Sequence, residues 1–415
     1  SSPTHIEDVR RAPTDVLSFH DALNDIIFVD AMFGVNMTGF HISIIRSHLT
    51  RQLPAVFPNI WDELCKAFED HIPLQDGEWT KVPAAETMAA IVARATSRLF
   101  VGYPLCRNKE YLKLITDYTA VVSGWSNLIR TFPPFLRRVA ARMLSPLPAT
   151  LKKLDAMLGP VVEERRQQLK MYRKEWDGKP EDLITWTLET GSGEELEHDN
   201  ILRRMLRFNF AAIHTTSRTL SFALFHLASE HMKYLSPLRA EIEAIVSVHG
   251  WTKESIDKMS KLDSFIRESH RHHGLATTNM FRKARSDFTF SDGTRVPKGT
   301  HLAVAAIPRQ IELGGGEEFD GFRFAHVDGE EESEEAAKHK FVSIGMNYLS
   351  FGLGRNACPG RFWASNEIKT MLAYMVYNFD IRMEYDGVLP EPRWIGITGT
   401  PDPTACLMLR KRRDV

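Results

Sequence analysis

The sequence predicts a mainly α-helical protein with a small β-rich region, and three observations support this fold class. Apolar residues recur at i, i+3 and i+4 over residues 57–71 and 84–100, the spacing of amphipathic helices. Residues 199–230 contain neither proline nor glycine, and their second half is mostly apolar or small, as expected of a helix that crosses a core. Alternating polarity around Asp292-Gly293 predicts a β-hairpin.

Composition bounds the classes of function. The chain has 415 residues, of which 43% are hydrophobic and 25% charged, an ordinary globular composition for which length alone suggests two or three domains. A net charge of −1 implies no bulk attraction to nucleic acid, and no nucleic-acid partner is expected. The four cysteines form no C-x-x-C pair, which argues against a disulfide scaffold or a zinc site: Cys65, Cys106, Cys358 and Cys406.

No run of about 18 apolar residues is present, so no membrane span is predicted, and no signal peptide opens the chain. The first residues read as a loop and then a short helix from Ile6. Residues 39–53 follow with apolar residues at helical spacing, and this segment carries His41, Arg46 and Arg51. A binding role and a solvated basic helix face are equally good interpretations of these three residues.

Further helices are predicted at residues 108–129 and 148–176, and a polar loop at 177–182. Two prolines, Pro133 and Pro134, break the chain between these helices. Apolar and basic residues then alternate with helical period through residues 131–146, a pattern that suits a membrane interface and equally an ordinary connection between helices. The acidic run at 329–335 reads as a solvated loop.

The long helix has a polar gap in its middle. Ala211 and Ala212 remove bulk from one face, and Thr215 and Thr216 place hydroxyl groups beside that space. A threonine in a helix often bonds the carbonyl four residues earlier, so Thr215 has the choice of Ala211 or a ligand. Small residues that only allow close helix packing are the alternative interpretation.

Glu268 and Arg271 lie at i, i+3 on one predicted helix face, where an exposed pair would contribute only a few tenths of a kcal/mol. His270, His272 and His273 lie beside this pair without ligand-like spacing to another cluster, and we interpret them as surface or structural residues rather than metal ligands.

The chemistry of the chain is predicted to centre on residues 351–360, Phe-Gly-Leu-Gly-Arg-Asn-Ala-Cys-Pro-Gly, followed by a helix over about 362–376. A thiolate in such a loop can bind haem iron, and cysteine ligation favours O–O cleavage. Glycines allow backbone N–H groups to approach the sulfur of Cys358, and the start of the next helix stabilises its negative charge. Arg355 offers a fork for a carboxylate such as a haem propionate. A buried structural cysteine is the alternative.

These motifs resemble those of the cytochrome P450 family, whose cysteine loop reads F-x-x-G-x-R-x-C-x-G. The matching cofactor-binding residues are Phe351, Gly352, Gly354, Arg355, Cys358 as the axial iron ligand, and Gly360, with Arg355 one residue away from the commonest spacing. The family's E-x-x-R motif matches Glu268 and Arg271, and Arg323 lies where the third member of that internal clamp belongs.

The resemblance extends to the long helix, where the family has A/G-G-x-D/E-T-T beside the oxygen-binding face of the haem. Ala211, Ala212, Thr215 and Thr216 match, and His214 replaces the acid, so the resemblance implies that Thr215, with His214 and Thr216, supports proton delivery. Three further residues are implied to contact the haem propionates: Arg282, before the hairpin, with His41 and Arg51. The implied pocket lining includes residues 276–278 and 396–400.

The resemblance implies one catalytic domain over residues 1–415, folded around a buried haem b (iron protoporphyrin IX). It implies a monooxygenase that inserts one oxygen atom from O2 into a hydrophobic small molecule, with NADPH-cytochrome P450 reductase or cytochrome b5 as electron donor. Similarity to fungal members suggests a terpenoid or other secondary metabolite as substrate. We further expect a natural N-terminal anchor that this chain lacks, and a place on the cytosolic face of the endoplasmic reticulum membrane; a naturally short, soluble member is the alternative.

Two other functions stay open at this point. A haem-thiolate peroxygenase, isomerase or dehydratase would need no reductase, and His214 in place of the acid motivates this alternative. A non-catalytic haem sensor or carrier is the third hypothesis, against which the retained Thr215 and the small-residue gap argue.

Overall fold

The computed structural model describes residues 2–34, 39–73, 77–172, 175–326 and 337–412. Contacts divide the chain into two compact units, which are described separately. Unit 1 comprises residues 1–19, 68–90 and 215–415, and unit 2 comprises residues 20–67 and 91–214. The acidic run at 329–335 lies within the undescribed segment 327–336, so its predicted loop stays a prediction.

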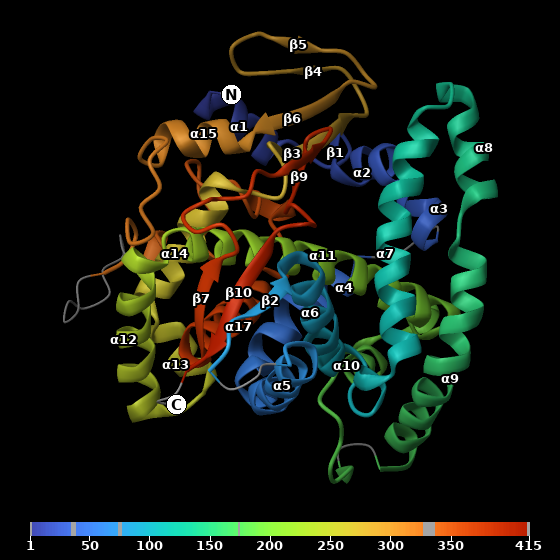
Figure 1. The fold of residues 1–415 in the computed structure, drawn as a ribbon. Coiled ribbons are helices and arrows are strands. Elements are labelled where there is room, and N and C mark those ends of the chain that lie inside the picture. The colour runs from blue at the N-terminus through green and yellow to red at the C-terminus, as the bar shows by residue number, and fades with distance from the viewer. Residues whose placement is uncertain (1, 35–38, 74–76, 173–174, 327–336, 413–415) are drawn as a thin grey trace. The chain divides into compact units, whose positions relative to one another are not determined.

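Unit 2 is helical, and two of its helices begin at a capping residue or a proline. The side chain of Asn108 accepts a hydrogen bond from the N–H of Tyr111 (3.0 Å) and starts α7, and Pro134 opens α8. Helix α7 runs alongside α8 and α9 (Figure 1). The helices of this unit, some of which extend into unit 1, are α2 (Phe19–Ile27), α3 (Val29–Phe33), α4 (Phe40–Ser43), α5 (Thr50–His71), α6 (Ala84–Phe100), α7 (Lys109–Arg130), α8 (Pro134–Leu144), α9 (Leu147–Tyr172) and α10 (Leu183–Thr190).

The segment expected to be helical over 39–53 is continuous with the helix predicted at 57–71. Helix α4 passes into a π-helical turn, Ile44–Leu49, and then directly into α5. The predicted start at residue 57 was therefore wrong, because Pro54 and Pro58 lie inside the helix. Pro54 stands near the helix start, where a missing N–H costs least.

Unit 1 combines helices with four small sheets. Helix α17 (Arg361–Asn378) packs against α12 (His231–His249), α13 (Lys253–Lys258) and α14 (Ser260–His272). The sheets have the antiparallel strand orders β1-β3-β6, β2-β10-β7, β4-β5 and β8-β9. The remaining elements are α1 (Pro3–Arg11), α15 (Ala306–Leu313), β1 (Leu17–Ser18), β2 (Thr80–Pro83), β3 (Thr278–Ala284), β4 (Phe288–Thr289), β5 (Arg295–Val296), β6 (His301–Ala305), β7 (Phe379–Met383), β8 (Arg393–Ile395), β9 (Thr398–Thr400) and β10 (Cys406–Lys411).

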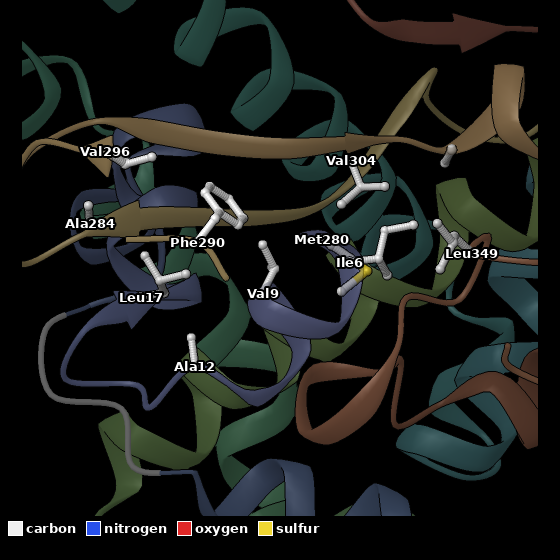
Figure 2. Close-up of a cluster of buried hydrophobic side chains, with 11 residues drawn as sticks. Ile6, Val9, Ala12, Leu17, Met280, Ala284, Phe290, Val296, Val304 and Leu349 are labelled. Carbon is white, nitrogen blue, oxygen red and sulfur yellow. The ribbon is translucent and has the colours of Figure 1, made fainter. Parts of the chain in front are cut away.

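A compact apolar cluster joins the N-terminal helix to the first sheet of unit 1. Figure 2 shows Ile6 and Val9 of α1 facing Met280 of β3 and Val304 of β6, with Leu349 at the same end of the cluster. The predicted hairpin at Asp292-Gly293 is confirmed, since β4 pairs with β5 around it. Burial of these side chains, typically about 1.5–3 kcal/mol each, stabilises the sheet edge that leads to the cysteine loop.

Helix α11 (His198–Ser229) is the predicted long helix, with bounds one residue from those expected. Its residues up to His214 belong to unit 2 and those from Thr215 to unit 1. In the described part of the chain, no helix combines the length and the apolarity needed to cross a bilayer.

Candidate functional site

The cysteine loop folds back on itself through glycines that take left-handed torsions. Gly352 has φ +71° and Gly354 has φ +72°, and at Gly354 a Cβ would lie 2.6 Å from the side chain of Arg10. The N–H of Cys358 donates to the carbonyl oxygen of Phe351 (2.8 Å), which closes the loop. Gly360 caps α17, so Cys358 lies just before a helix N-terminus.

The groups around Cys358 shift the pKa of its thiol in opposite directions. Burial raises the pKa of Cys358, while the N–H groups of Gly360 and Arg361 and the charge of Arg361 lower it. Three donors of partial or full positive charge therefore face the sulfur, and a metal cation would complete the stabilisation of the thiolate. Cys106 is the contrast, because burial and the charge of Glu63 raise its pKa to about 12.

Two arginines that the sequence predicts as cofactor ligands lie near each other in unit 1. Arg282 of β3 is only 2% exposed, and burial together with the charge of Arg355 lowers its pKa to about 10. Among the described residues no carboxylate pairs with Arg282, whose Nη1 donates to the carbonyl of Phe281 (2.8 Å). A buried cation beside a second cation fits an anionic group such as a haem propionate.

Arg355 also ties the loop to the N-terminal helix. Its Nη2 donates to the carbonyl oxygens of Arg11 (3.0 Å) and Ala12 (3.1 Å) at the end of α1. With the family's spacing, Asn356 rather than Arg355 is the residue two before the cysteine. Cofactor binding by Arg355 stays a prediction.

The structure brings Glu268, Arg271 and Arg323 together in a buried network. Arg271 donates to both oxygens of Glu268 (2.7 and 2.8 Å), and Nε of Arg323 lies 3.2 Å from Oε1. Burial alone would raise the pKa of Glu268, but hydrogen bonds from Arg271, His272 and the N–H of Asp320 lower it to about 2. Loss of one partner would leave a buried charge unpaired, which typically costs about 3–5 kcal/mol.

The histidines beside this clamp are interior residues. His270 is buried on α14, its Nδ1 lies 3.1 Å from the hydroxyl of Tyr348, and its ring lies 5.7 Å from that of Phe351 in the cysteine loop. His273 bonds His226 of α11 (2.8 Å). In the described residues no three His, Cys, Asp or Glu side chains gather as metal ligands. The interpretation of these histidines as surface or structural residues stays a prediction.

The side chains of the predicted polar gap in α11 point in different directions. Ala211 and Thr215 are exposed and lie one turn apart, whereas Thr216 is buried and its hydroxyl has no hydrogen-bond partner among the residues that the structure describes. His214 turns toward α7, where Nε2 lies 2.5 Å from Oγ1 of Thr119. The sequence offered no signal for Thr119, because the contact joins residues 95 positions apart.

The two remaining predicted haem contacts lie in unit 2. His41 of α4 is buried, with its ring 6.1 Å from that of Phe208. Arg51 of α5 is exposed, and its Nε donates to the carbonyl of Ser47 (3.0 Å). Ala212, the other small residue predicted beside the haem, is half-buried on α11. The roles of these three residues stay predictions.

The two segments predicted to line a substrate pocket meet within unit 1. Ala276 forms an antiparallel bridge with Thr398, and the N–H of Thr277 donates to the carbonyl of Ile397 (2.9 Å). Trp394, Ile395 and Ile397 of the β8–β9 hairpin are exposed, which leaves an apolar surface beside this bridge.

Comparison with known proteins agrees with these features. The family model for cytochrome P450 matches residues 40–408. Cytochrome P450 monooxygenase 151 of Postia placenta is 38% identical over 414 residues, which are 98% of this chain and 83% of the relative. Cytochrome P450 monooxygenase CYP512U6 of Ganoderma lucidum is 31% identical, with coverage of 98% and 80%. The crystal structure of the cytochrome P450DA heme domain superposes with a TM-score of 0.73 at 18% identity, covering 99% of this chain and 87% of that one, which shows the same fold.

Members of this family carry a haem held by a cysteine thiolate, generally take electrons from redox partners and act on hydrophobic substrates. The buried Cys358 with its N–H donors and the arginines beside it suit that cofactor. The predicted fold class, mainly helical with a small β-rich region, is confirmed. The chain belongs to the cytochrome P450 family of haem-thiolate monooxygenases and is an oxidoreductase.

Proposed function

We propose that this oxidoreductase inserts one oxygen atom from O2 into a hydrophobic small molecule, a terpenoid or another secondary metabolite, using haem b. Electrons would come from NADPH-cytochrome P450 reductase, with cytochrome b5 as a second donor. The observation that carries the proposal is the buried sulfur of Cys358, which faces two backbone N–H groups and the charge of Arg361. A haem bound there supplies the redox chemistry of dioxygen, which side chains alone do not provide.

The chain's own residues would hold and orient that group. Cys358 would ligate the iron, and Arg282 with Arg355 would bind the propionates, since the guanidinium of Arg282 is buried beside the charge of Arg355. Thr215 is exposed on α11, and its hydroxyl would hold a proton donor or a water. The apolar β8–β9 hairpin beside Ala276 supports a hydrophobic substrate.

A reductase-independent peroxygenase, isomerase or dehydratase is the second candidate, and one observation favours it. His214 occupies the position of the family's acid, and its imidazole bonds Thr119 of α7. An imidazole engaged in this way is a weaker substitute for a carboxylate that relays protons. The predicted sensor or carrier role gains no support from any particular contact.

The deciding experiment combines a spectrum with a turnover assay. The reduced, carbon monoxide-bound protein should show the absorption band of thiolate-ligated haem, and Cys358→Ser should abolish it. Cys106→Ser is the matched control, because that thiol is also buried but has no comparable donors, and it should keep the band. NADPH-dependent turnover with reductase supports the monooxygenase. Turnover with hydroperoxide alone, and none with reductase, would establish the second candidate instead.

We also propose that the protein works at the cytosolic face of the endoplasmic reticulum membrane and contacts the bilayer through residues 131–146. Helix α8 exposes Phe135 (79%) and Met143 (80%), with Arg138 and Arg142 on its exposed surface. Exposed apolar groups flanked by cations suit the interface of an anionic membrane. Flotation with phosphatidylserine-containing vesicles should weaken in the Phe135→Ser/Met143→Ser variant, and equal flotation of both proteins would contradict this contact.

A further inference from the structure

We propose that Asn279 is a positioning residue whose side-chain amide sets the geometry of the cysteine loop and of Arg282 together. The proposal rests on the assignment of Cys358 as the haem ligand, and it concerns a residue outside the motifs identified in the sequence. Asn279 lies on β3, three residues before Arg282. All the contacts that support the proposal lie within unit 1.

The nitrogen of the amide holds the segment that enters the cysteine loop. Nδ2 of Asn279 donates to the carbonyl oxygens of Leu349 (2.8 Å) and Ser350 (3.0 Å), the two residues directly before Phe351. The carbonyl of Leu349 also accepts the N–H of Gly352 (2.8 Å), and the carbonyl of Phe351 accepts the N–H of Cys358. One donor group therefore lies at the start of a chain of bonds that ends at the ligating residue.

Gln310 of α15 binds the same dipeptide through one backbone N–H and one side-chain hydroxyl. Its Oε1 accepts the N–H of Leu349 (2.8 Å) and the hydroxyl of Ser350 (3.0 Å). Gln310 is buried, and Asn279 is half-buried. Together the two amides bind the carbonyl oxygens of Leu349 and Ser350 and the N–H of Leu349. The backbone of this segment therefore has little freedom to rotate.

The oxygen of the Asn279 amide shapes the strand that carries Arg282. Oδ1 accepts the N–H of Met280 (2.7 Å), and Met280 has φ +56°, a torsion that costs an ordinary side chain about 1 kcal/mol or more. The pairing of β3 with β6 shifts register between Asn279 and Arg282. The Met280 side chain is thereby buried in the cluster that also contains Leu349, and the two lie at the same end of it in Figure 2.

One amide thus couples two groups that a haem would require at once, a thiolate on one side and a buried guanidinium on the other. A bulge re-aims the side chains that follow it, and here that side chain is Arg282. Without the amide, the loop and the strand would each sample other conformations. The apparent affinity for the cofactor would fall in proportion to the fraction of molecules that keep both groups in place.

Two substitutions separate the two halves of the amide. Asn279→Asp keeps an acceptor for the N–H of Met280 but removes both donors to the loop and places a charge against two carbonyl oxygens. Asn279→Ala removes both halves. Asn378→Ala is the matched control, because Asn378 also donates to a backbone carbonyl (Tyr374, 2.8 Å) but lies at the end of α17, away from the loop.

Each variant is measured as holoprotein by two readouts that do not depend on turnover. The first is the ratio of thiolate-ligated to non-thiolate haem in the reduced, carbon monoxide-bound spectrum, and the second is the rate of haem transfer to apomyoglobin. We expect Asn279→Asp to lower the ratio by about thirtyfold, since it loses two hydrogen bonds of about 1 kcal/mol each. Asn279→Ala should lower the ratio equally and also raise the transfer rate by about tenfold.

Wild-type values of both quantities in Asn279→Asp and Asn279→Ala would overturn the proposal. Equal changes in Asn378→Ala would overturn it as well, because they would show a general effect of losing a half-buried amide. If Asn279→Ala does not fold, the ratio in the nearly isosteric Asn279→Asp decides alone. A wild-type protein without the thiolate band would instead refute the assignment of Cys358, so failure of the proposed function is distinguishable from failure of this inference.

Discussion

Acidification is expected to destabilise the protein through two buried imidazoles, His270 and His273. Burial lowers the pKa of His270 to about 4, and burial together with the charge of His272 lowers the pKa of His273 to about 4. In the unfolded chain the pKa of a histidine lies near its ordinary value of 6.5. Below that value the unfolded state binds more protons than the folded state, so stability is lost as pH falls from about 6.5 toward about 4.

The size of this loss follows from the two pKa values. At about pH 5 an unfolded histidine is almost fully protonated, whereas one with a folded pKa of about 4 is mostly neutral, and the difference costs about 2 kcal/mol for each residue. The two residues together account for about 4 kcal/mol, a large part of the stability of an ordinary domain. His226 acts in the same direction, because burial and the charges of His273 and His272 hold its pKa well below the usual range.

The assay is urea unfolding followed by tryptophan fluorescence, at about pH 8 and about pH 5, for the wild type and for His270→Leu. Leucine suits the rings of Phe341 and Phe351 but loses the bond to Tyr348, a cost that is the same at both pH values. The fall in unfolding free energy between the two pH values should be about 2 kcal/mol smaller in the variant. Ile266→Val, a buried apolar change on the same helix, should lower stability equally at both. The reasoning is refuted if His270→Leu shows the wild-type pH dependence.

Three further outcomes are expected. Glu63→Gln should destabilise the protein by about 3 kcal/mol in chemical unfolding, because it removes the carboxylate that pairs with buried Arg94; a loss below about 0.5 kcal/mol would contradict a buried pair. Thr216→Val should leave the melting temperature unchanged or raise it, since the hydroxyl it removes is buried without a hydrogen-bond partner, and a clear decrease would show that the hydroxyl is satisfied. Thr119→Val should cost about 1 kcal/mol by removing the hydroxyl that bonds His214, whereas Thr119→Ser should not; equal losses in the two variants would count against that bond.

The sequence predicted the helices well where local signals were strong. The helix at residues 84–100 has the expected bounds, and the capping residue Asn108 defined the next helix to within one residue. The start of α5 was misplaced, because the helix begins at Thr50 and contains Pro54 and Pro58. Local patterns thus located the elements, and tertiary packing decided where one of them began.

The cysteine loop was predictable because its residues are contiguous, but its support was not. Asn279 contacts residues 70 and 71 positions away, and Gln310 contacts residues 39 and 40 positions away, so no spacing rule could associate them. His270 was expected at the surface or in a structural role, and only the packing of α14 shows it to be buried against the loop. The sequence located the ligand, whereas the folded chain shows which side chains hold it.

The contact between Arg355 and the end of α1 has a practical consequence for anyone who shortens or tags this protein. Residues 3–12 pack directly against the cysteine loop. The last carbonyl oxygens of this segment accept hydrogen bonds from Arg355, and the side chain of Arg10 lies against Gly354. Removing the residues up to Ala12 would remove these contacts and expose the rest of the apolar cluster to solvent. The haem spectrum is therefore the proper quality control for any change at the N-terminal end, even though that end is about 350 residues away from Cys358 in the sequence.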